Sequence, residues 1–238
     1  MRLDKYLSHA TGLTRSEVKT AVKQKRVKVN DKLVLKSDFF IDPNTDIVYL
    51  NGQKVEYKEF IYIMLNKPQG VVSATRDTKY KTVIDLIADD YSNYDCFPMG
   101  RLDIDTEGLL ILTNNGSLLH KVMSPKSEIY KKYYCEVDGE FNSSDINMFL
   151  KGFDILDGKD ELYHTKKSYL EIIDTNKAYI SICEGKFHQI KRMCEATNKK
   201  VTYLKRVEMK GITLDENLKP GEYRELTIDE LNKLLSIE

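Results

Sequence analysis

The sequence predicts an α+β protein in which a small N-terminal domain precedes a larger second domain. Segments with the apolar patterns of strands outnumber helical segments, and several are joined by connections of hairpin length. This arrangement favours a mixed, mainly antiparallel sheet flanked by helices over a doubly wound parallel sheet. Charge also divides the chain, because residues 1–40 carry a net charge of +6 and the other 198 residues a net charge of −6. A basic module on a mildly acidic body is typical of a polyanion-binding appendage attached to a separate working domain.

The first domain, which we expect over residues 1–57, consists of two short helices followed by short strands. Apolar residues at helical spacing form the first helix, which Gly12 ends. Thr14 and Glu17 form a capping box that begins a second helix, extending to about Gln24. Alternating apolar residues then predict short strands, at residues 27–29, 33–35 and 46–50.

The second domain, which we expect over residues 58–238, contains both strand and helix patterns. The strand patterns lie at residues 60–65, 109–113, 133–137, 169–174, 178–183 and 201–207. The helix patterns are a helix capped by Ser117, a helix from Asn142 to Leu150 stopped by Gly152, a helix from Phe187 to Ala196, and a last helix capped by Thr227 and Glu230. In the third of these, we expect Phe187, Ile190 and Cys194 to share one buried stripe.

Composition argues against several kinds of protein. No stretch approaches the roughly 18 apolar residues of a membrane span, and the N-terminus lacks the apolar segment of a signal peptide, so we expect a cytoplasmic protein. The four cysteines form no CxxC pair and lie in apolar surroundings, which predicts reduced thiols. No His or Cys cluster has zinc spacing, and no glycine-rich phosphate loop follows a strand. We therefore expect neither a metal nor a nucleotide cofactor.

A polar loop lies immediately before the apolar run at residues 109–112. This loop contains Asp103 and Asp105 beside Arg101. A carboxylate held at the mouth of a core strand next to a fixed cation suits nucleophilic or acid–base chemistry. A salt-bridged structural loop would also explain the pattern.

Two other segments place polar side chains at the end or the beginning of strands. Lys67 precedes Pro68 in a turn, where a solvated lysine and a structural turn are sufficient explanation. Tyr133 and Tyr134 follow two lysines at the beginning of a strand and must point to opposite faces of the sheet. One of the two tyrosines therefore faces the core or a cleft, although packing alone could account for it.

A cluster of cations lies at the beginning of the predicted helix at residues 187–196. His188, Lys191 and Arg192 lie on its first turns. Cations at a helix N-terminus oppose the helix dipole, so their position indicates an anionic partner, either a phosphate or a buried carboxylate. His188 could instead be a hydrogen-bonded structural histidine.

Taken together and in this order, the segments resemble the motifs of the RsuA family of pseudouridine synthases. The run at 100–115 resembles the catalytic aspartate motif of that family, and Asn66-Lys67-Pro68-Gln69-Gly70-Val71-Val72-Ser73 resembles its first core motif. Lys132-Tyr133 resembles the strand that bears its active-site tyrosine, and the run at 185–193 resembles its last motif. Residues 2–50 resemble the S4 RNA-binding domain that precedes the catalytic domain in this family.

The resemblance implies a reaction and a set of roles for particular residues. Asp103 would be the catalytic aspartate, with Asp105 outside the essential position. Tyr133 would pack against the target uracil and assist proton removal, and Lys191 would pair with the catalytic carboxylate. Arg101 would help to hold RNA after the target base has left its stack. The further candidates for RNA binding are Arg15, Lys19, Lys23, Arg26, His188 and Arg192.

The substrate is expected to be ribosomal RNA. The histidine and lysine within Phe187-His188-Gln189-Ile190-Lys191 look more like the enzymes that act on small-subunit (16S) rRNA than like the large-subunit branch. The same reaction on 23S rRNA remains an alternative, as does a non-catalytic RNA-binding factor in ribosome assembly. We expect no membrane partner and a monomeric protein.

Overall fold

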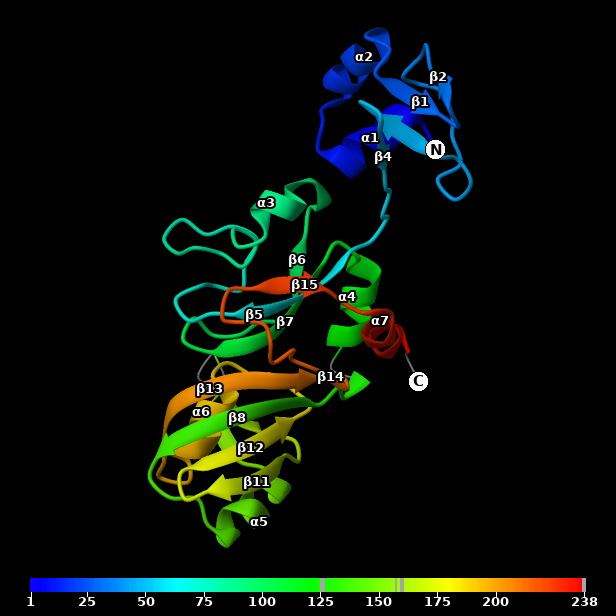
Figure 1. Ribbon diagram of the computed structural model, residues 1–238. Coiled ribbons are helices and arrows are strands. Elements are labelled where there is room, and N and C mark those ends of the chain that lie inside the picture. Colours follow the sequence, from blue (N-terminus) through cyan, green and yellow to red (C-terminus); the bar gives the residue numbers. More distant parts are fainter. Residues whose placement is uncertain (125–126, 157, 159–160, 237–238) are drawn as a thin grey trace. The chain divides into compact units, whose positions relative to one another are not determined.

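The computed structural model describes residues 1–124, 127–156, 158 and 161–236 (Figure 1). The chain forms two compact units. One contains Met1–Ile61 together with Ala88–Cys96, and the other contains Tyr62–Ile87 together with Phe97–Glu238. Both combine helices with sheets, which confirms the predicted α+β class. In the part of the chain that the structure describes, no helix is both long and apolar enough to cross a bilayer.

The first unit packs two helices against a small antiparallel sheet. Its elements are α1 (Leu3–Thr11), α2 (Arg15–Lys23), β1 (Val27–Val29), β2 (Lys32–Leu33), β3 (Val48–Leu50) and β4 (Gln53–Val55), with strand order β2-β1-β3-β4. Gly12 ends α1 in the left-handed conformation, as expected. The predicted capping box of Thr14 and Glu17 is present at the start of α2. Both helices bury one apolar face in a common core.

A segment from later in the chain joins this first unit. It consists of α3 (Ala88–Tyr91) and a 3₁₀ helix, η1 (Ser92–Tyr94). The Asn93 side-chain amide donates a hydrogen bond to the carbonyl of His9. The His9 ring lies against the rings of Tyr57 and Tyr94, with centroids 5.0 Å away in each case. Residues far apart in the sequence thus complete this unit.

The second unit is built on a mixed sheet with the strand order β11-β12-β8-β13-β7-β5-β15. Its strands are β5 (Tyr62–Lys67), β6 (Phe97–Met99), β7 (Glu107–Thr113), β8 (Lys131–Asp138), β11 (Tyr169–Asp174), β12 (Lys177–Ile182), β13 (Lys200–Met209), β14 (Ile212–Thr213) and β15 (Tyr223–Glu225). The pairing of β7 with β13 is parallel, and the other described pairings in the sheet are antiparallel. The prediction of a mixed, mainly antiparallel sheet is confirmed. A separate hairpin contains β9 (Asp154–Leu156) and β10 (Leu162–His164).

The helices of the second unit are α4 (Gly116–Met123), α5 (Ser143–Lys151), α6 (Gln189–Glu195) and α7 (Ile228–Leu235). The caps expected at Asn142 and Thr227 are present. Two expectations were wrong. Asn115, not Ser117, caps α4, because its side-chain oxygen accepts the Leu118 amide hydrogen bond. Helix α6 begins at Gln189, so Phe187 lies before it, 54% exposed, and not on its buried stripe.

The parallel junction of β7 and β13 depends on a close approach of two backbones. Gly108 has φ +104°, and a Cβ at this position would lie 2.2 Å from the carbonyl oxygen of Arg206. Only glycine can adopt this conformation at such a distance. The loop before β7, the beginning of β8 and the turn before α6 meet close to this junction and form the lining of a pocket.

Candidate active site

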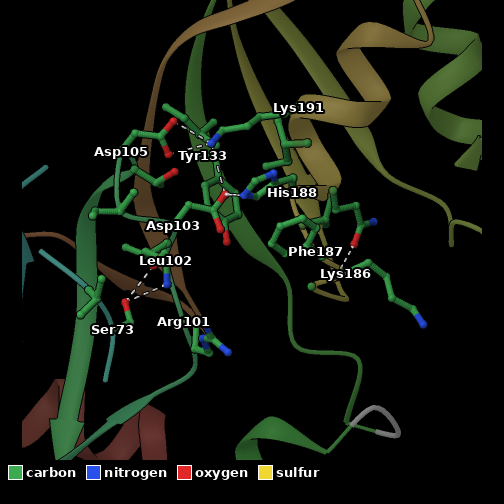
Figure 2. Close-up of a pocket in the computed structure, with 18 residues that line it drawn as sticks. Ser73, Arg101, Leu102, Asp103, Asp105, Tyr133, Lys186, Phe187, His188 and Lys191 are labelled. Atoms are coloured by element: carbon green, nitrogen blue, oxygen red, sulfur yellow. Dashed lines mark hydrogen bonds and ion pairs between the residues drawn. The ribbon is translucent and has the colours of Figure 1, made fainter. Parts of the chain in front are cut away.

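The polar segments identified in the sequence converge on a pocket of about 520 Å³ in the second unit (Figure 2). Asp103 and Asp105 come from the loop before β7, Tyr133 from β8, and His188 and Lys191 from the turn before α6 and its first residues. These side chains are more than 80 residues apart in the sequence at the extremes, and the strand order β8-β13-β7 brings them together. Asp103, Tyr133 and Lys191, which come from three separate segments of the sequence, thus line one pocket.

Lys191 connects the two carboxylates of the pocket. Its Nζ lies 2.7 and 2.9 Å from the two carboxylate oxygens of Asp105 and 3.3 Å from Oδ2 of Asp103. The ammonium is therefore shared, and its shorter contacts are with Asp105 and not with the expected Asp103. Burial raises the pKa of Asp105, but the hydrogen bond and charge of Lys191 outweigh this effect and hold that pKa below its ordinary value.

Asp103 has a second nitrogen-bearing neighbour. The Nε2 atom of His188 lies 3.8 Å from Asp103 Oδ2. The Asp103 side chain is 32% exposed, so it is accessible from the pocket while remaining next to Lys191. A partly buried carboxylate beside an ammonium and an imidazole is suited to act as a nucleophile or base on a bound ligand.

Lys67 holds the loop that carries Asp103. Its side chain is fully buried, and Nζ donates hydrogen bonds to the backbone carbonyls of Pro68, Asp103 and Thr106 at 2.9 to 3.0 Å. Burial lowers its pKa to about 8, although the carboxylates of Asp103 and Asp105 oppose that change. The interpretation of Lys67 as a solvated lysine was wrong. The signal in the sequence for a buried Lys67 was its position shortly after the apolar run of β5.

Ser73, the last residue of the motif at residues 66–73, also fixes this loop, a role that the sequence did not indicate. Its Oγ donates to the Leu102 carbonyl at 2.9 Å and accepts from the Leu102 amide at 3.0 Å. The amide of Gly70 also donates to the carbonyl of Ile104 at 2.8 Å. The backbone around Asp103 is thus hydrogen-bonded at four positions, residues 102, 103, 104 and 106, to the end of β5 and to the segment that follows it.

Tyr133 and Tyr134 point to opposite faces of the sheet, as expected. Tyr133 is 7% exposed and lines the pocket with Asp103. The hydroxyl of Tyr134 instead donates to Glu136 at 2.6 Å on the other face. Tyr133 is therefore the tyrosine of this pair that a ligand in the pocket could contact.

The turn before α6 is held in an unusual conformation. His188 has φ +51° and occupies the position before the first helical residue. Its ring stacks on that of Phe187, with a centroid distance of 3.8 Å and an angle of 20° between the planes. Gln189 fixes this turn by donating to Glu184 at 2.7 Å and accepting from the Lys186 amide at 2.9 Å. The His188 ring is therefore presented to the pocket from a constrained backbone.

Comparison with known proteins identifies the family. Residues 61–196 match the RNA pseudouridylate synthase family. The chain belongs to this family. Residues 1–47 match the S4 domain. The resemblance to RsuA-type pseudouridine synthases is thereby confirmed, together with the expectation of an enzyme.

Several relatives are similar to this pseudouridine synthase over nearly their whole length. An RNA pseudouridine synthase of Bacillus subtilis, YtzG, is 43% identical over 238 residues, which cover 98% of each chain. Ribosomal small subunit pseudouridine synthase A of Escherichia coli is 35% identical, covering 97% of this chain and 98% of the relative. The crystal structure of a pseudouridylate synthase aligns with a TM-score of 0.68 at 36% identity, covering 99% of this chain and all of the other.

The remaining candidate residues of this pseudouridine synthase lie at different places. Arg101 is exposed and lines the pocket. Arg192 does not line it, because its guanidinium donates to the carbonyl of Leu156 and lies 5.3 Å from the centre of the Phe187 ring. The candidates in the S4 domain are exposed on α2 and the residues after it, at Arg15, Lys19, Lys23 and Arg26.

The part of the chain that the structure describes contains no set of side chains that could bind a metal ion. These residues contain no group of three or more His, Cys, Asp or Glu side chains that could hold an ion. The four cysteines are buried and not disulfide-bonded. Burial raises the pKa of the Cys96 thiol to about 12, so this side chain is a thiol and not a thiolate at neutral pH.

Proposed function

We propose that this enzyme isomerises a specific uridine in small-subunit (16S) ribosomal RNA to pseudouridine, with Asp103 as the catalytic carboxylate. The observation that carries the proposal is the convergence of Asp103, Lys191 and Tyr133 in one pocket. The name of the Escherichia coli relative supports the substrate, since that protein is a small-subunit pseudouridine synthase. An rRNA substrate would place the reaction in the cytoplasm.

The reaction explains why these groups are needed. Isomerisation breaks the N1–C1′ bond, turns the uracil and joins it to the ribose through C5, and the proton on C5 must then leave. Asp103 would act as nucleophile or base, and Lys191, 3.3 Å from its Oδ2, would place a positive charge beside it. Tyr133 would form one wall of the base pocket and assist removal of the C5 proton. His188 would stabilise charge near Asp103 at 3.8 Å.

The target uridine must leave its stack before it can reach Asp103. Extrusion costs a few kcal/mol, which contacts with the RNA on both sides of the target must offset. The exposed Arg101 at the pocket would occupy the space that the base leaves, with Leu102 and Ile190 as apolar walls. The exposed cations of α2 would contribute affinity through phosphate contacts. The convergence in the pocket favours this enzyme over the non-catalytic assembly factor.

The experiment that tests the substrate is a map of pseudouridines in rRNA from a strain in which this gene is deleted. We expect one pseudouridine in 16S rRNA to disappear and to return when the wild-type gene is supplied. Complementation with an Asp103→Asn allele is the matched control and should not restore it. Loss of a 23S site with an intact 16S pattern would support the large-subunit alternative, and an unchanged pattern in both would contradict the proposal.

A further inference from the structure

A second, larger pocket lies next to the pocket that contains Asp103. Its volume is about 980 Å³, and the two pockets share Arg101, Tyr133, Gly185 and Lys186. The basic side chains in its lining are Arg101, His120, Lys131, Lys166, Lys186 and Arg206. Among the described lining residues, Glu184 is the one carboxylate. The second pocket therefore has a strong excess of positive charge.

Arg206 is the most deeply buried of these cations. It is 1% exposed, and its Nε donates to the carbonyl of Leu109 at 2.7 Å. Its Nη2 is buried and has no hydrogen-bond partner among the described residues. A buried guanidinium that lacks a carboxylate partner and leaves a donor unused is costly. An anion in the pocket would offset that cost.

A second buried cation lies on the same face of the sheet. Lys131 is 9% exposed and its Nζ donates to the carbonyl of Ile129 at 3.1 Å. Lys131 and Tyr133 are two residues apart on β8, so both point to one face. Arg206 is paired with Tyr133 in the neighbouring strand β13. Two buried cations thus flank the tyrosine that also lines the catalytic pocket.

The carboxylate in the lining is already occupied by other partners. Glu184 accepts hydrogen bonds from the hydroxyl of Tyr163 at 2.6 Å, from the side chain of Gln189 at 2.7 Å and from the Lys166 amide at 2.8 Å. Within the described part of the chain, Lys131 and Arg206 instead donate to backbone carbonyls, of Ile129 and Leu109, and Arg206 Nη2 has no partner. The charge of these two residues therefore remains available to a ligand.

We propose that the second pocket binds a phosphate of the RNA backbone next to the extruded uridine, with Arg206 and Lys131 supplying the buried positive charge. A nucleotide whose base enters the pocket of Asp103 carries a phosphate on each side of its ribose, and the shared residues Arg101 and Tyr133 place the second pocket beside it. The identity of the polyanion rests on the proposed function. The preference for a phosphate rests on the charge of the pocket alone.

The test compares two adjacent lysines on opposite faces of β8. Lys131→Met removes a cation of the pocket, whereas Lys132→Met removes one that pairs with Glu171 at 3.0 Å on the other face. Affinity for a fluorescent 16S rRNA fragment is measured by anisotropy at several salt concentrations. We expect Lys131→Met to bind about tenfold more weakly, with a salt slope smaller by roughly 0.7 to 0.9. Lys132→Met should bind as the wild type does.

Two further measurements identify the source of the phosphate and guard against a folding defect. An RNA with one neutral methylphosphonate linkage beside the target uridine should bind the wild type more weakly than the unmodified RNA does. Lys131→Met should bind the two RNAs with equal affinity. Arg206→Lys, which keeps the charge, should retain more affinity than Arg206→Met. The circular dichroism spectrum of each variant shows whether it is folded, and Lys131→Gln replaces Lys131→Met if the latter is not.

The outcomes separate this inference from the proposed function. Equal RNA affinity and salt slope for wild type and Lys131→Met would overturn it. Binding of inorganic phosphate is followed by ³¹P NMR. If Lys131→Met abolished this binding without changing the RNA affinity, the inference would also be overturned, because the site would then bind a free anion. Turnover is measured separately, by release of tritium from C5-labelled uridine, so a protein that binds phosphate here without isomerising uridine would contradict only the proposed function.

Discussion

The two units of this pseudouridine synthase carry positive charge in contrasting ways. In the S4 domain, Arg15, Lys19 and Lys23 lie exposed on α2, whereas Val18, Ala21 and Val22 of that helix are buried. In the catalytic unit, Lys67 and Arg206 are buried, at 0% and 1% exposure. Exposed cations act through water and are screened by salt, whereas buried cations act strongly on the few groups they touch. The first arrangement suits attraction of a polyanion, and the second suits the positioning of a reactive loop.

Among the cations, the largest effect is expected at the lysine shared by the two carboxylates. Lys191→Met removes the ammonium that lies 2.7 Å from Asp105 and 3.3 Å from Asp103. We expect turnover to fall by about 100-fold or more, since Asp103, the proposed catalytic carboxylate, would lose its neighbouring positive charge. Tritium release under single-turnover conditions measures the effect. Lys191→Arg keeps the charge and should recover part of the rate, and full activity of Lys191→Met would remove the lysine from the mechanism.

The contrast between buried and exposed cations can be tested directly with Lys67 and Lys19. Lys67→Met deprives three backbone carbonyls of their shared donor and should lower the free energy of unfolding by about 1–3 kcal/mol. Turnover should also fall by about tenfold or more, because the Asp103 loop loses its anchor. Lys19→Met, on the exposed side of α2, should change the free energy of unfolding by less than about 0.5 kcal/mol. Urea denaturation measures the free energy of unfolding of both variants. An equal loss in the two would contradict the contrast between buried and exposed cations.

The free energy of unfolding should depend on pH because of Lys131, the buried lysine of the second pocket. Burial, followed by the charge of Arg206, lowers the pKa of Lys131 from 10.5 to about 8. The unfolded chain then binds more protons than the folded protein between pH 8 and 10.5, so this lysine makes stability rise with pH across that window. Below pH 8 its destabilising effect is fully present.

The measurement is the free energy of unfolding of wild type and Lys131→Met at pH 7, 8, 9 and 10. We expect the wild type to gain stability relative to the variant as the pH rises, by up to about 3 kcal/mol over the whole window. Lys132→Met should follow the wild type. A constant difference between wild type and Lys131→Met at all four pH values would show that this ammonium is not destabilised by burial.

The smallest effect on the reaction itself is expected in the S4 domain. Replacing Lys19, Lys23 and Arg26 together by Ala should weaken rRNA binding and reduce the salt slope by up to about 0.7 for each lost phosphate contact. The rate at saturating RNA should stay within about twofold of wild type, because these residues belong to the other unit. Unchanged affinity would show that α2 does not face the RNA.

Local patterns in the sequence predicted the elements well, and long-range contacts account for what they missed. The capping box at Thr14 and the stop at Gly12 depend on neighbouring residues, so both could be read from the sequence. Besides the adjacent Pro68, the partners of Lys67 and Ser73 are backbone groups 29 to 39 residues away, which no periodicity reveals. Phe187 was assigned to a buried stripe because helical spacing cannot show that the helix begins two residues later.

The candidate site shows the same division between local and long-range information. The motifs singled out Asp103, Tyr133 and Lys191, and the structure places all three in one pocket. The hydrogen bonds of Lys191 to Asp105 depend on how α6 meets the loop before β7, which sequence order does not reveal. The buried state of Arg206 depends likewise on the junction of β7 with β13.

The most direct test of the central claim is a comparison of Asp103→Asn with Asp105→Asn. Both substitutions remove one negative charge from the pair that shares Lys191, so they have a similar effect on the charge of the pocket. Tritium release from C5-labelled 16S rRNA is measured for each variant, together with RNA affinity. We expect Asp103→Asn to bind RNA as wild type does without detectable release, while Asp105→Asn retains measurable turnover. Release of tritium by Asp103→Asn at a rate near that of wild type would contradict the assignment of the catalytic carboxylate.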